Sequence, residues 1–294
     1  AHFINTHQEE LRAIIKSGTS YAAAQSTLLQ NAGFTFAAAE ANDILALEYC
    51  RCLQKYAPQI APLVIRRCGA GYNSSDISAE YASASGIRTE YAAAGLSGRI
   101  LKQIPECSHK LLETLHSLNL LGWNTEKLDA LVLYKLCMLT EQQIAAACEC
   151  TEGLEHRLKA AAAFPDMQSV VSSVSSKRYT KSRIRRLLMQ LLLGNDKTIF
   201  TEAKPQYLRV LAFNSRGRSL LAQMRKTASL PVITKIGRNF KNCLTGDTAK
   251  DELIIRQLQM DINAANLLAL LQNRSQNYCQ IYNSDFLMQP FQQA

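Results

Sequence analysis

The chain has 294 residues, 47% of them hydrophobic, and a formal net charge of +9 at pH 7. This length and composition suffice for about two domains with hydrophobic cores, and they exclude a disordered protein. Because the sequence has neither a run of about eighteen apolar residues nor a signal peptide at its start, we expect a cytoplasmic protein without a membrane anchor.

Two helical regions come first in the chain. Residues 6–29 show helical periodicity that is broken at Gly18, and Ser20 is suited to cap a second helix. Asn42 is suited to begin a strongly periodic helix that ends before Pro58. The apolar spacing of both regions is typical of helices that pack one face on a core.

Residues 62–67 have the pattern of a buried β-strand that runs into a loop containing Gly69 and Gly71. A helix followed by such a strand and loop is typical of α/β folds. Only one convincing strand is present, however, and a strand cannot bury both faces without neighbours. We therefore expect residues 1–100 to form an incomplete, Rossmann-like α/β unit.

A candidate anion site lies where this strand ends. Glycines let backbone N–H groups approach a ligand, a helix N-terminus offers unpaired donors, and guanidinium groups match phosphate oxygens. The candidate phosphate-binding residues are Arg66, Arg67, Ser83, Ser85 and Arg88. The alternatives are that the arginines only face solvent and that the serines, like Asn42, only cap helices.

The chain beyond Gly98 has helical spacing throughout. The later segments Tyr207–Asn214 and Leu253–Leu271 are also helix-like. The predicted fold class is therefore mainly α, with an incomplete α/β domain over residues 1–100 followed by an all-helical domain over residues 101–294.

The excess positive charge lies in one part of the chain. Residues 151–240 contain 17 Lys/Arg against 5 Asp/Glu, and no comparable excess occurs before or after them. A helix beginning near Thr180 would dock by a leucine-rich stripe and show its arginines to solvent. A charged helix face is often merely solvated, but the charge excess and the aromatic Tyr179 favour RNA, through phosphate contacts and base stacking.

The candidate nucleic-acid contacts in this basic region are Lys177, Arg178, Tyr179, Lys181, Arg183, Arg185, Arg186, Arg209, Arg216 and Arg218. DNA is not excluded by these residues alone. Their common feature is a positive charge, or in one case an aromatic ring, within a segment that is poor in acids.

Catalytic and metal-binding motifs are missing from the sequence. It contains no Walker A loop, no Gly-x-Ser-x-Gly elbow and no His-x-Gly-His motif, so no residue is assigned a catalytic role. The nine cysteines and five histidines are scattered without CxxC or HxxxH pairs. We therefore expect reduced cysteines and no protein-bound metal.

Five runs together resemble the tRNA(Met) cytidine acetate ligase family of bacterial nucleotidyltransferases. Their order and spacing cover most of the chain. They are Asn42-Asp43-Ile44-Leu45-Ala46-Leu47-Glu48-Tyr49, Ile65-Arg66-Arg67 with Gly69-Ala70-Gly71-Tyr72, Ala82-Ser83-Ala84-Ser85-Gly86-Ile87-Arg88, Lys177-Arg178-Tyr179-Thr180, and Leu208-Arg209-Val210-Leu211-Ala212-Phe213-Asn214.

The resemblance implies a nucleotidyltransferase fold at the N-terminal side and an activity that uses ATP, acetate and tRNA. Such enzymes join acetate to ATP, giving acetyl-adenylate and pyrophosphate, and then acetylate N4 of the wobble cytidine of elongator tRNA(Met). Asn42 and Arg67 match ATP-binding positions of the family, and residues 83–88 match its phosphate motif. Mg²⁺ would be held by the nucleotide, and the helical region would hold the tRNA.

The chain also departs from the family pattern, which begins with a nucleotide-binding strand and a His-x-Gly-His motif. We therefore expect a C-terminal portion of such an enzyme, lacking the N-terminal part and inactive alone. Two alternatives stay open: a non-catalytic helical RNA-binding module, and a nucleotidyltransferase that adenylates a different substrate. The oligomeric state does not follow from the sequence.

Overall fold

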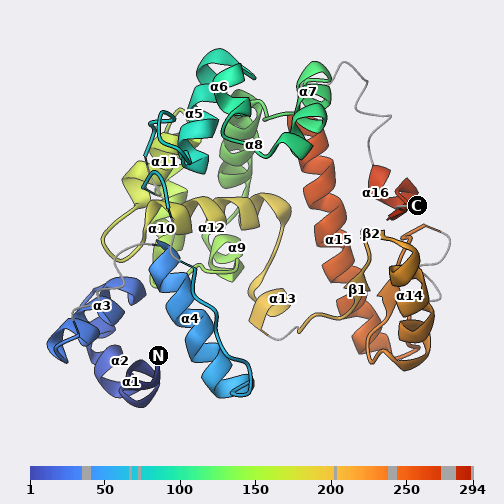
Figure 1. Ribbon diagram of the computed structural model, residues 1–294. Helices are drawn as coiled ribbons and strands as arrows, with labels where there is room; N and C mark the ends of the chain where they lie inside the picture. Colours follow the sequence, from blue (N-terminus) through green and yellow to red (C-terminus); the bar gives the residue numbers. More distant parts are fainter. Residues whose placement is uncertain are drawn as a thin grey trace. The chain divides into compact units, whose positions relative to one another are not determined.

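The computed structural model describes residues 1–34, 41–65, 68–71, 74–201, 204–237, 244–272 and 283–292. Helices make up most of these residues, which confirms the prediction of a mainly α protein (Figure 1). The chain forms two compact units, one of residues 1–117 with 176–180 and one of residues 118–175 with 181–294. The domain boundary near residue 100 stays a prediction.

The first unit is helical in all its regular elements that the structure describes. They are α1 (His2–Thr6), α2 (Gln8–Lys16), α3 (Tyr21–Asn31), α4 (Ala41–Tyr56), α5 (Ala84–Ala94), α6 (Gly98–Leu101), the 3₁₀ helix η1 (Glu106–Ser108) and α7 (His109–Ser117).

The core at the start of this unit is formed by α1, α2 and α3. Ile4, Leu11 and Leu28 are buried together, one from each of the three helices. Gly18 lies between α2 and α3 with a φ of +94°, and the Ser20 hydroxyl caps α3 by accepting a hydrogen bond from the Ala23 N–H. The predicted helices and the break between them are confirmed.

The predicted buried strand is not formed over residues 62–65. Leu63, Val64 and Ile65 are 87%, 78% and 83% exposed, and residues 61–65 do not form a strand. A strand needs a neighbour to satisfy its backbone donors and acceptors, and the described residues of the first unit include no other strand. Residues 66 and 67, which complete the predicted strand, lie outside the described residues.

The second unit combines a helical bundle with a smaller mixed region. Its helices are α8 (Thr125–Met138), α9 (Glu141–Ala146), α10 (Leu154–Ala160), η2 (Ala161–Ala163), α11 (Met167–Val174), α12 (Lys181–Leu193), α13 (Lys197–Thr201), α14 (Ser215–Thr227), α15 (Thr248–Leu271) and α16 (Ser284–Leu287). Its strands are β1 (Leu208–Arg209), β2 (Ala212–Phe213), β3 (Val232–Ile233) and β4 (Phe291–Gln292).

Helix α12 lies at the centre of the bundle, where it contacts α8, α11 and α15. Its residues Ile184, Leu187, Leu188 and Leu191 are buried, which confirms that the helix docks by one apolar stripe. The length of α15 likewise confirms the helix expected over Leu253–Leu271.

The expectation of an all-helical second domain is wrong at residues 207–214. This segment forms β1 and β2 instead of a helix, in parallel pairs with β3 and β4. The register places Arg209 opposite Ile233 and Phe213 opposite Gln292. Because both partner strands come from distant parts of the chain, tertiary pairing overrides the local helical pattern.

Candidate functional site

The two halves of the predicted phosphate clamp are joined within the first unit. The Ala70 N–H donates a hydrogen bond to the Tyr81 carbonyl at 2.9 Å, two residues before Ser83. Gly69 has a φ of +89°, and a Cβ at this position would lie 2.5 Å from the Tyr81 carbonyl oxygen. Gly69 is therefore needed for this close approach of two backbone segments, whereas a Cβ at Gly71 would meet open space.

Ser83 caps α5 and is completely buried. Its hydroxyl accepts a hydrogen bond from the Gly86 N–H at 2.9 Å and donates one to the Ser74 carbonyl. Gly86 is itself packed closely, because a Cβ there would lie 3.1 Å from the Ile77 side chain. The capping alternative thus describes Ser83, whose side chain fixes the start of α5 and leaves no free group for a ligand.

Ser85 and Arg88 occupy the first turns of α5 and have accessible side chains. The Arg88 Nη2 lies 3.5 Å from the Ser85 Oγ, so the two groups are close enough to act on one ligand. The first N–H groups of a helix have no intrahelical partner and carry a partial positive charge. Arg88, Ser85 and this helix end together form an arrangement suited to an anion.

The remaining predicted nucleotide contacts are Asn42, Arg66 and Arg67. Asn42 is exposed in the first turn of α4, close to the predicted helix start. Arg66 and Arg67 lie outside the described residues, so the structure does not place them relative to α5.

The arginines of α12 are largely engaged by neighbouring elements of the second unit. Arg183 donates to the Glu149 carbonyl and to the Thr151 hydroxyl, both at 3.1 Å. Arg186 forms a two-point ion pair with the Glu149 carboxylate, with both contacts at 3.2 Å. Arg185 donates to the Gln168 side chain at 2.7 Å and is otherwise exposed.

The segment before α12 contains both exposed and buried groups. Lys177, Arg178 and Lys181 are exposed. Tyr179 is only 6% exposed, and the Arg178 guanidinium lies 5.8 Å from the centre of its ring. The predicted role of Tyr179 as a stacking surface does not fit this burial, because the ring is not open to a base.

Arg209 belongs to a partly buried cluster of ion pairs within the second unit. Its guanidinium contacts Asp261 at 3.2 Å and Asp285 at 3.1 Å, and Tyr207 donates a hydrogen bond to Asp261 at 2.9 Å. Burial would lower the pKa of Arg209, but the hydrogen bonds and charges of Asp285 and Asp261 outweigh this and raise it. Burial and the bond to Asp261 raise the pKa of Tyr207. The cluster joins β1, α15 and α16, so we assign Arg209 a structural role.

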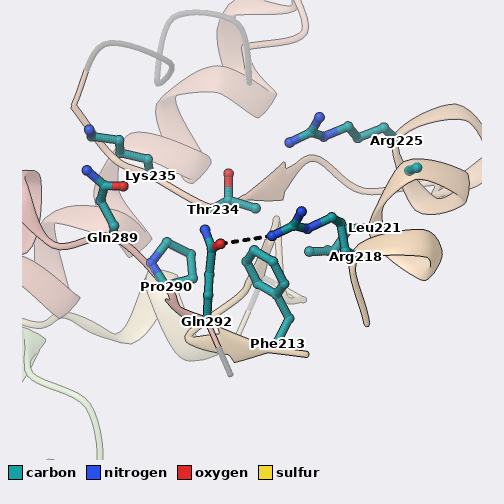
Figure 2. A pocket seen from close by; sticks show the side chains of 10 residues that line it. Phe213, Arg218, Leu221, Arg225, Thr234, Lys235, Gln289, Pro290 and Gln292 are labelled. Carbon is teal, nitrogen blue, oxygen red and sulfur yellow. Dashed lines mark hydrogen bonds between the residues drawn. The ribbon is translucent and has the colours of Figure 1, made fainter. Parts of the chain in front are cut away.

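The remaining two arginines lie on α14, which borders a pocket of about 300 Å³ (Figure 2). Asn214 caps the helix by accepting a hydrogen bond from the Gly217 N–H at 2.9 Å. Gly217 leaves room for Phe213, since a Cβ there would lie 3.0 Å from the Phe213 Cβ. Because β2 pairs with β4, Gln292 lies beside Phe213 and accepts a hydrogen bond from Arg218 at 3.1 Å.

This α14 pocket also contains residues that were not predicted. It is lined by Phe213, Arg218, Arg225, Thr234, Lys235 and Gln292, among others. Arg216, by contrast, is exposed and does not line the pocket. The seven-residue spacing of Arg218 and Arg225 was a usable signal in the sequence, because it places both on one helix face. No such signal marks the lining residues that follow β3 (Thr234 and Lys235) or Gln292 in β4.

Other kinds of site are not evident in the part of the chain that the structure describes. Within it, no three His, Cys, Asp or Glu side chains are grouped as metal ligands. No helix formed by these residues is long and apolar enough to span a membrane.

Comparison with known proteins gives consistent matches. A family model described as HIGH Nucleotidyl Transferase matches residues 1–282. The tRNA(Met) cytidine acetate ligase of Thermoanaerobacter sp. (strain X514) is 34% identical over 79% of this chain and 59% of its own length. The protein of the same name from Acetivibrio thermocellus is 29% identical over 90% of this chain and 65% of its own length. The chain thus spans less than two thirds of these relatives.

Two solved structures of Thermotoga maritima TmcAL have the same fold. The apo form I has a TM-score of 0.80 and the form bound with alpha-thio ATP a TM-score of 0.81, both at 24% sequence identity. Each comparison covers 97% of this chain, with 70% and 69% of the respective Thermotoga chain.

The family match also corrects an expectation. It begins at residue 1, which conflicts with the interpretation of the chain as a C-terminal portion that lacks the N-terminal part of the family pattern. The expected inactivity of the chain depended on that interpretation and is not supported.

Proposed function

Since this chain belongs to the HIGH nucleotidyl transferase family, we propose that its protein is an ATP-dependent ligase that activates acetate and acetylates elongator tRNA(Met). The relatives named tRNA(Met) cytidine acetate ligase support this choice of reaction. The alpha-thio ATP bound to the Thermotoga protein supports ATP as the nucleotide. A protein with this role acts where tRNA is found, so we also propose a cytoplasmic location.

The observation that carries the proposal is the packing of the glycine loop on the start of α5. The Ala70–Tyr81 hydrogen bond and the Ser83 cap fix this helix end, next to which Ser85 and Arg88 are accessible. We propose that this end of α5 binds the ATP phosphates, with Asn42, Arg66 and Arg67 as further nucleotide contacts. Ser83 acts by positioning the helix end and does not itself touch the nucleotide.

Two successive steps make up the proposed reaction. An acetate oxygen attacks the α-phosphorus of ATP, and pyrophosphate leaves with the electrons of the broken P–O bond. The cytidine N4 then attacks the acetyl carbonyl, AMP leaves, and N4 loses a proton. Preorganised donors such as the α5 N–H groups and Arg88 stabilise charge that moves onto the phosphates in the first step. Mg²⁺ enters this proposal as part of the ATP complex.

For tRNA we propose contacts from α12 and the segment before it, through side chains that are exposed and that the Glu149 carboxylate does not engage. They are Lys177, Arg178, Lys181 and Arg185. Such contacts with phosphates contribute affinity without reading sequence.

The proposal is tested with the full-length protein and two assays. Acetate-dependent exchange of pyrophosphate into ATP reports the first step, and transfer of labelled acetate to an elongator tRNA(Met) transcript reports both. We expect exchange that needs acetate but no tRNA. Exchange that appears only with another acid would indicate a different adenylating enzyme. Binding of tRNA with no exchange for any acid would indicate an RNA-binding module.

A further inference from the structure

We propose that the α14 pocket binds a phosphate group of the RNA backbone. This inference rests on the proposed function for the identity of the RNA, but not for the chemistry of the pocket. Three features of the described residues favour a phosphate: the pocket cations form no ion pair, two of them lie on one face of α14, and polar groups lie opposite them.

The positive charge of the pocket is not neutralised by nearby acids. Within the described part of the chain, Arg218 bonds to the neutral amide of Gln292, and neither Arg225 nor Lys235 forms an ion pair. Residues 203–246 include nine Lys/Arg and no Asp or Glu, so the surrounding segment supplies no carboxylate. Of these nine cations, Arg209 is the one that Asp261 and Asp285 engage. An unneutralised group of cations attracts an anion.

The two pocket arginines lie on the same face of α14. At about 100° per residue, side chains seven positions apart differ by about 20° around the helix axis, and they are about 10 Å apart along it. Figure 2 shows Arg225 and Arg218 extending from the helix toward Thr234 and Gln292, respectively, which come from the far side of the pocket. A phosphate between them would receive charge-assisted hydrogen bonds from guanidinium groups and neutral ones from the hydroxyl and amide.

The surroundings favour an extended RNA strand over a free nucleotide. A second hollow of about 320 Å³ shares Arg225, and a third of about 180 Å³ shares Thr234 and Gln289 with the α14 pocket. The hollowed surface therefore continues on both sides of the pocket, beyond the length of one small ligand, with Ser229 and Thr245 in the second hollow and mainly apolar side chains in the third. A pocket for a free small ligand is lined mainly by hydrophobic and aromatic side chains. In contrast, six of the ten described residues that line the α14 pocket are polar or charged.

Arg225 also has a structural role at the end of α14, which the test must separate from phosphate binding. It lies in the last turn of α14, where a positive charge interacts favourably with the helix dipole. Arg225→Lys keeps this charge but loses the two-point geometry of the guanidinium. It therefore retains the helix contribution and weakens only the phosphate contact.

The experiment measures binding of an elongator tRNA(Met) transcript to the full-length protein at several salt concentrations, without ATP or acetate. We compare Arg218→Gln, Arg225→Gln and Arg225→Lys with the control Arg216→Gln. Arg216 carries the same charge on the same helix, but it lies about 160° and 180° around the axis from Arg218 and Arg225. Thermal unfolding of every variant checks that the fold is retained.

We expect each pocket Arg→Gln variant to weaken binding about tenfold at low salt, equivalent to about 1.4 kcal/mol, and to lower the salt slope by about 0.7 to 0.9. Arg216→Gln should change the affinity by less than about twofold. Arg225→Lys should fall between wild type and Arg225→Gln while unfolding at the wild-type temperature.

Three results would overturn the proposal. Equal weakening by Arg216→Gln would mean that only the general charge of α14 matters. Unchanged tRNA affinity in both Arg→Gln pocket variants would mean that the pocket does not bind RNA. A raised KM for ATP together with unchanged tRNA affinity would mean that the pocket binds the nucleotide instead. Because binding is measured without chemistry, a protein that lacks acetate-dependent exchange but shows the expected losses contradicts the proposed function and leaves the pocket assignment standing.

Discussion

Helices α12 and α14 carry the same positive charge but use it differently. Each has 13 residues, including four Lys or Arg. On α12, Arg183 and Arg186 are engaged by Glu149 and Thr151, and Arg185 bonds to the neutral amide of Gln168. On α14, Arg218 also bonds to a neutral amide, and with Arg225 it borders a pocket that no carboxylate of the described residues lines. Charge density therefore locates basic helices, but the surrounding groups decide which arginines remain available to an anion.

Packing explains this difference. Helix α12 buries four side chains among three other helices, so its arginines lie close to neighbouring elements that supply bonding partners. Helix α14 buries Leu221 alone and contacts the short strand β2. A helix that is less enclosed leaves more of its polar side chains directed toward open space.

The largest expected effect on the free energy of unfolding is at Arg209, a cation that is paired with two carboxylates of the protein. Arg209→Ala should lower the free energy of unfolding by about 3 kcal/mol, because it leaves Asp285, which is 8% exposed, without its ion-pair partner. Denaturant unfolding measures this loss. Arg209→Lys keeps the charge and should lose less; a loss under about 0.5 kcal/mol for the alanine variant would contradict the structural assignment.

The same distinction between engaged and available groups applies to two serines of α5. Ser83→Ala should lower the free energy of unfolding by about 1 to 2 kcal/mol, because it removes the cap of the helix and leaves buried groups unpaired. Ser85→Ala is the matched control, with a loss below about 0.5 kcal/mol but a raised KM for ATP in the exchange assay. Denaturant unfolding measures the loss of stability, and exchange kinetics measure the KM for ATP. If Ser85→Ala lowered the stability and Ser83→Ala raised only the KM, Ser85 would be the structural serine and Ser83 the nucleotide contact.

These examples show what the sequence could and could not predict. The leucine stripe of α12 and the Ser20 cap follow local rules of spacing and residue type, so both were predicted and are confirmed. The ion pairs of Arg209 depend on Asp261 and Asp285, which lie far along the chain, and local patterns carry no information about them. For the same reason, the segment at 207–214 was predicted as a helix but forms two strands.

The candidate site was predictable to a similar extent. The glycine loop and the start of α5 were expected to lie together, and the Ala70–Tyr81 hydrogen bond joins them. The sequence could not distinguish Ser83 from Ser85, because both are serines at a helix start. Burial and hydrogen bonding in the folded structure separate them. The ligand assignments of these residues stay predictions.

Arg186 provides a direct test of the comparison between the two helices. Arg186→Gln removes an ion pair with Glu149 that is partly exposed, so it should lower the free energy of unfolding by no more than about 1 kcal/mol. We expect the tRNA affinity to change by less than about twofold, in contrast to Arg225→Gln. Equal weakening by the two variants in the same binding assay would show that an ion pair does not prevent an arginine of α12 from binding RNA.

The smallest effect is expected at His156 on α10, whose positive charge is engaged by an acid and depends on pH. Its Nδ1 lies 2.9 Å from Glu141, and the hydrogen bond and charge of this carboxylate raise the pKa of His156 above its usual value of 6.5. The ion pair therefore contributes its full stability below about pH 6.5 and loses it as the pH rises through the raised pKa. His156→Gln should lower the thermal midpoint more at about pH 5.5 than at about pH 8.5, by an amount that salt reduces, because both groups are exposed. An equal effect at both pH values would mean that the imidazole stabilises α10 by packing and not by charge. The expected difference would show that His156, like Arg186 of α12, is a cation whose charge is paired with a carboxylate of the protein.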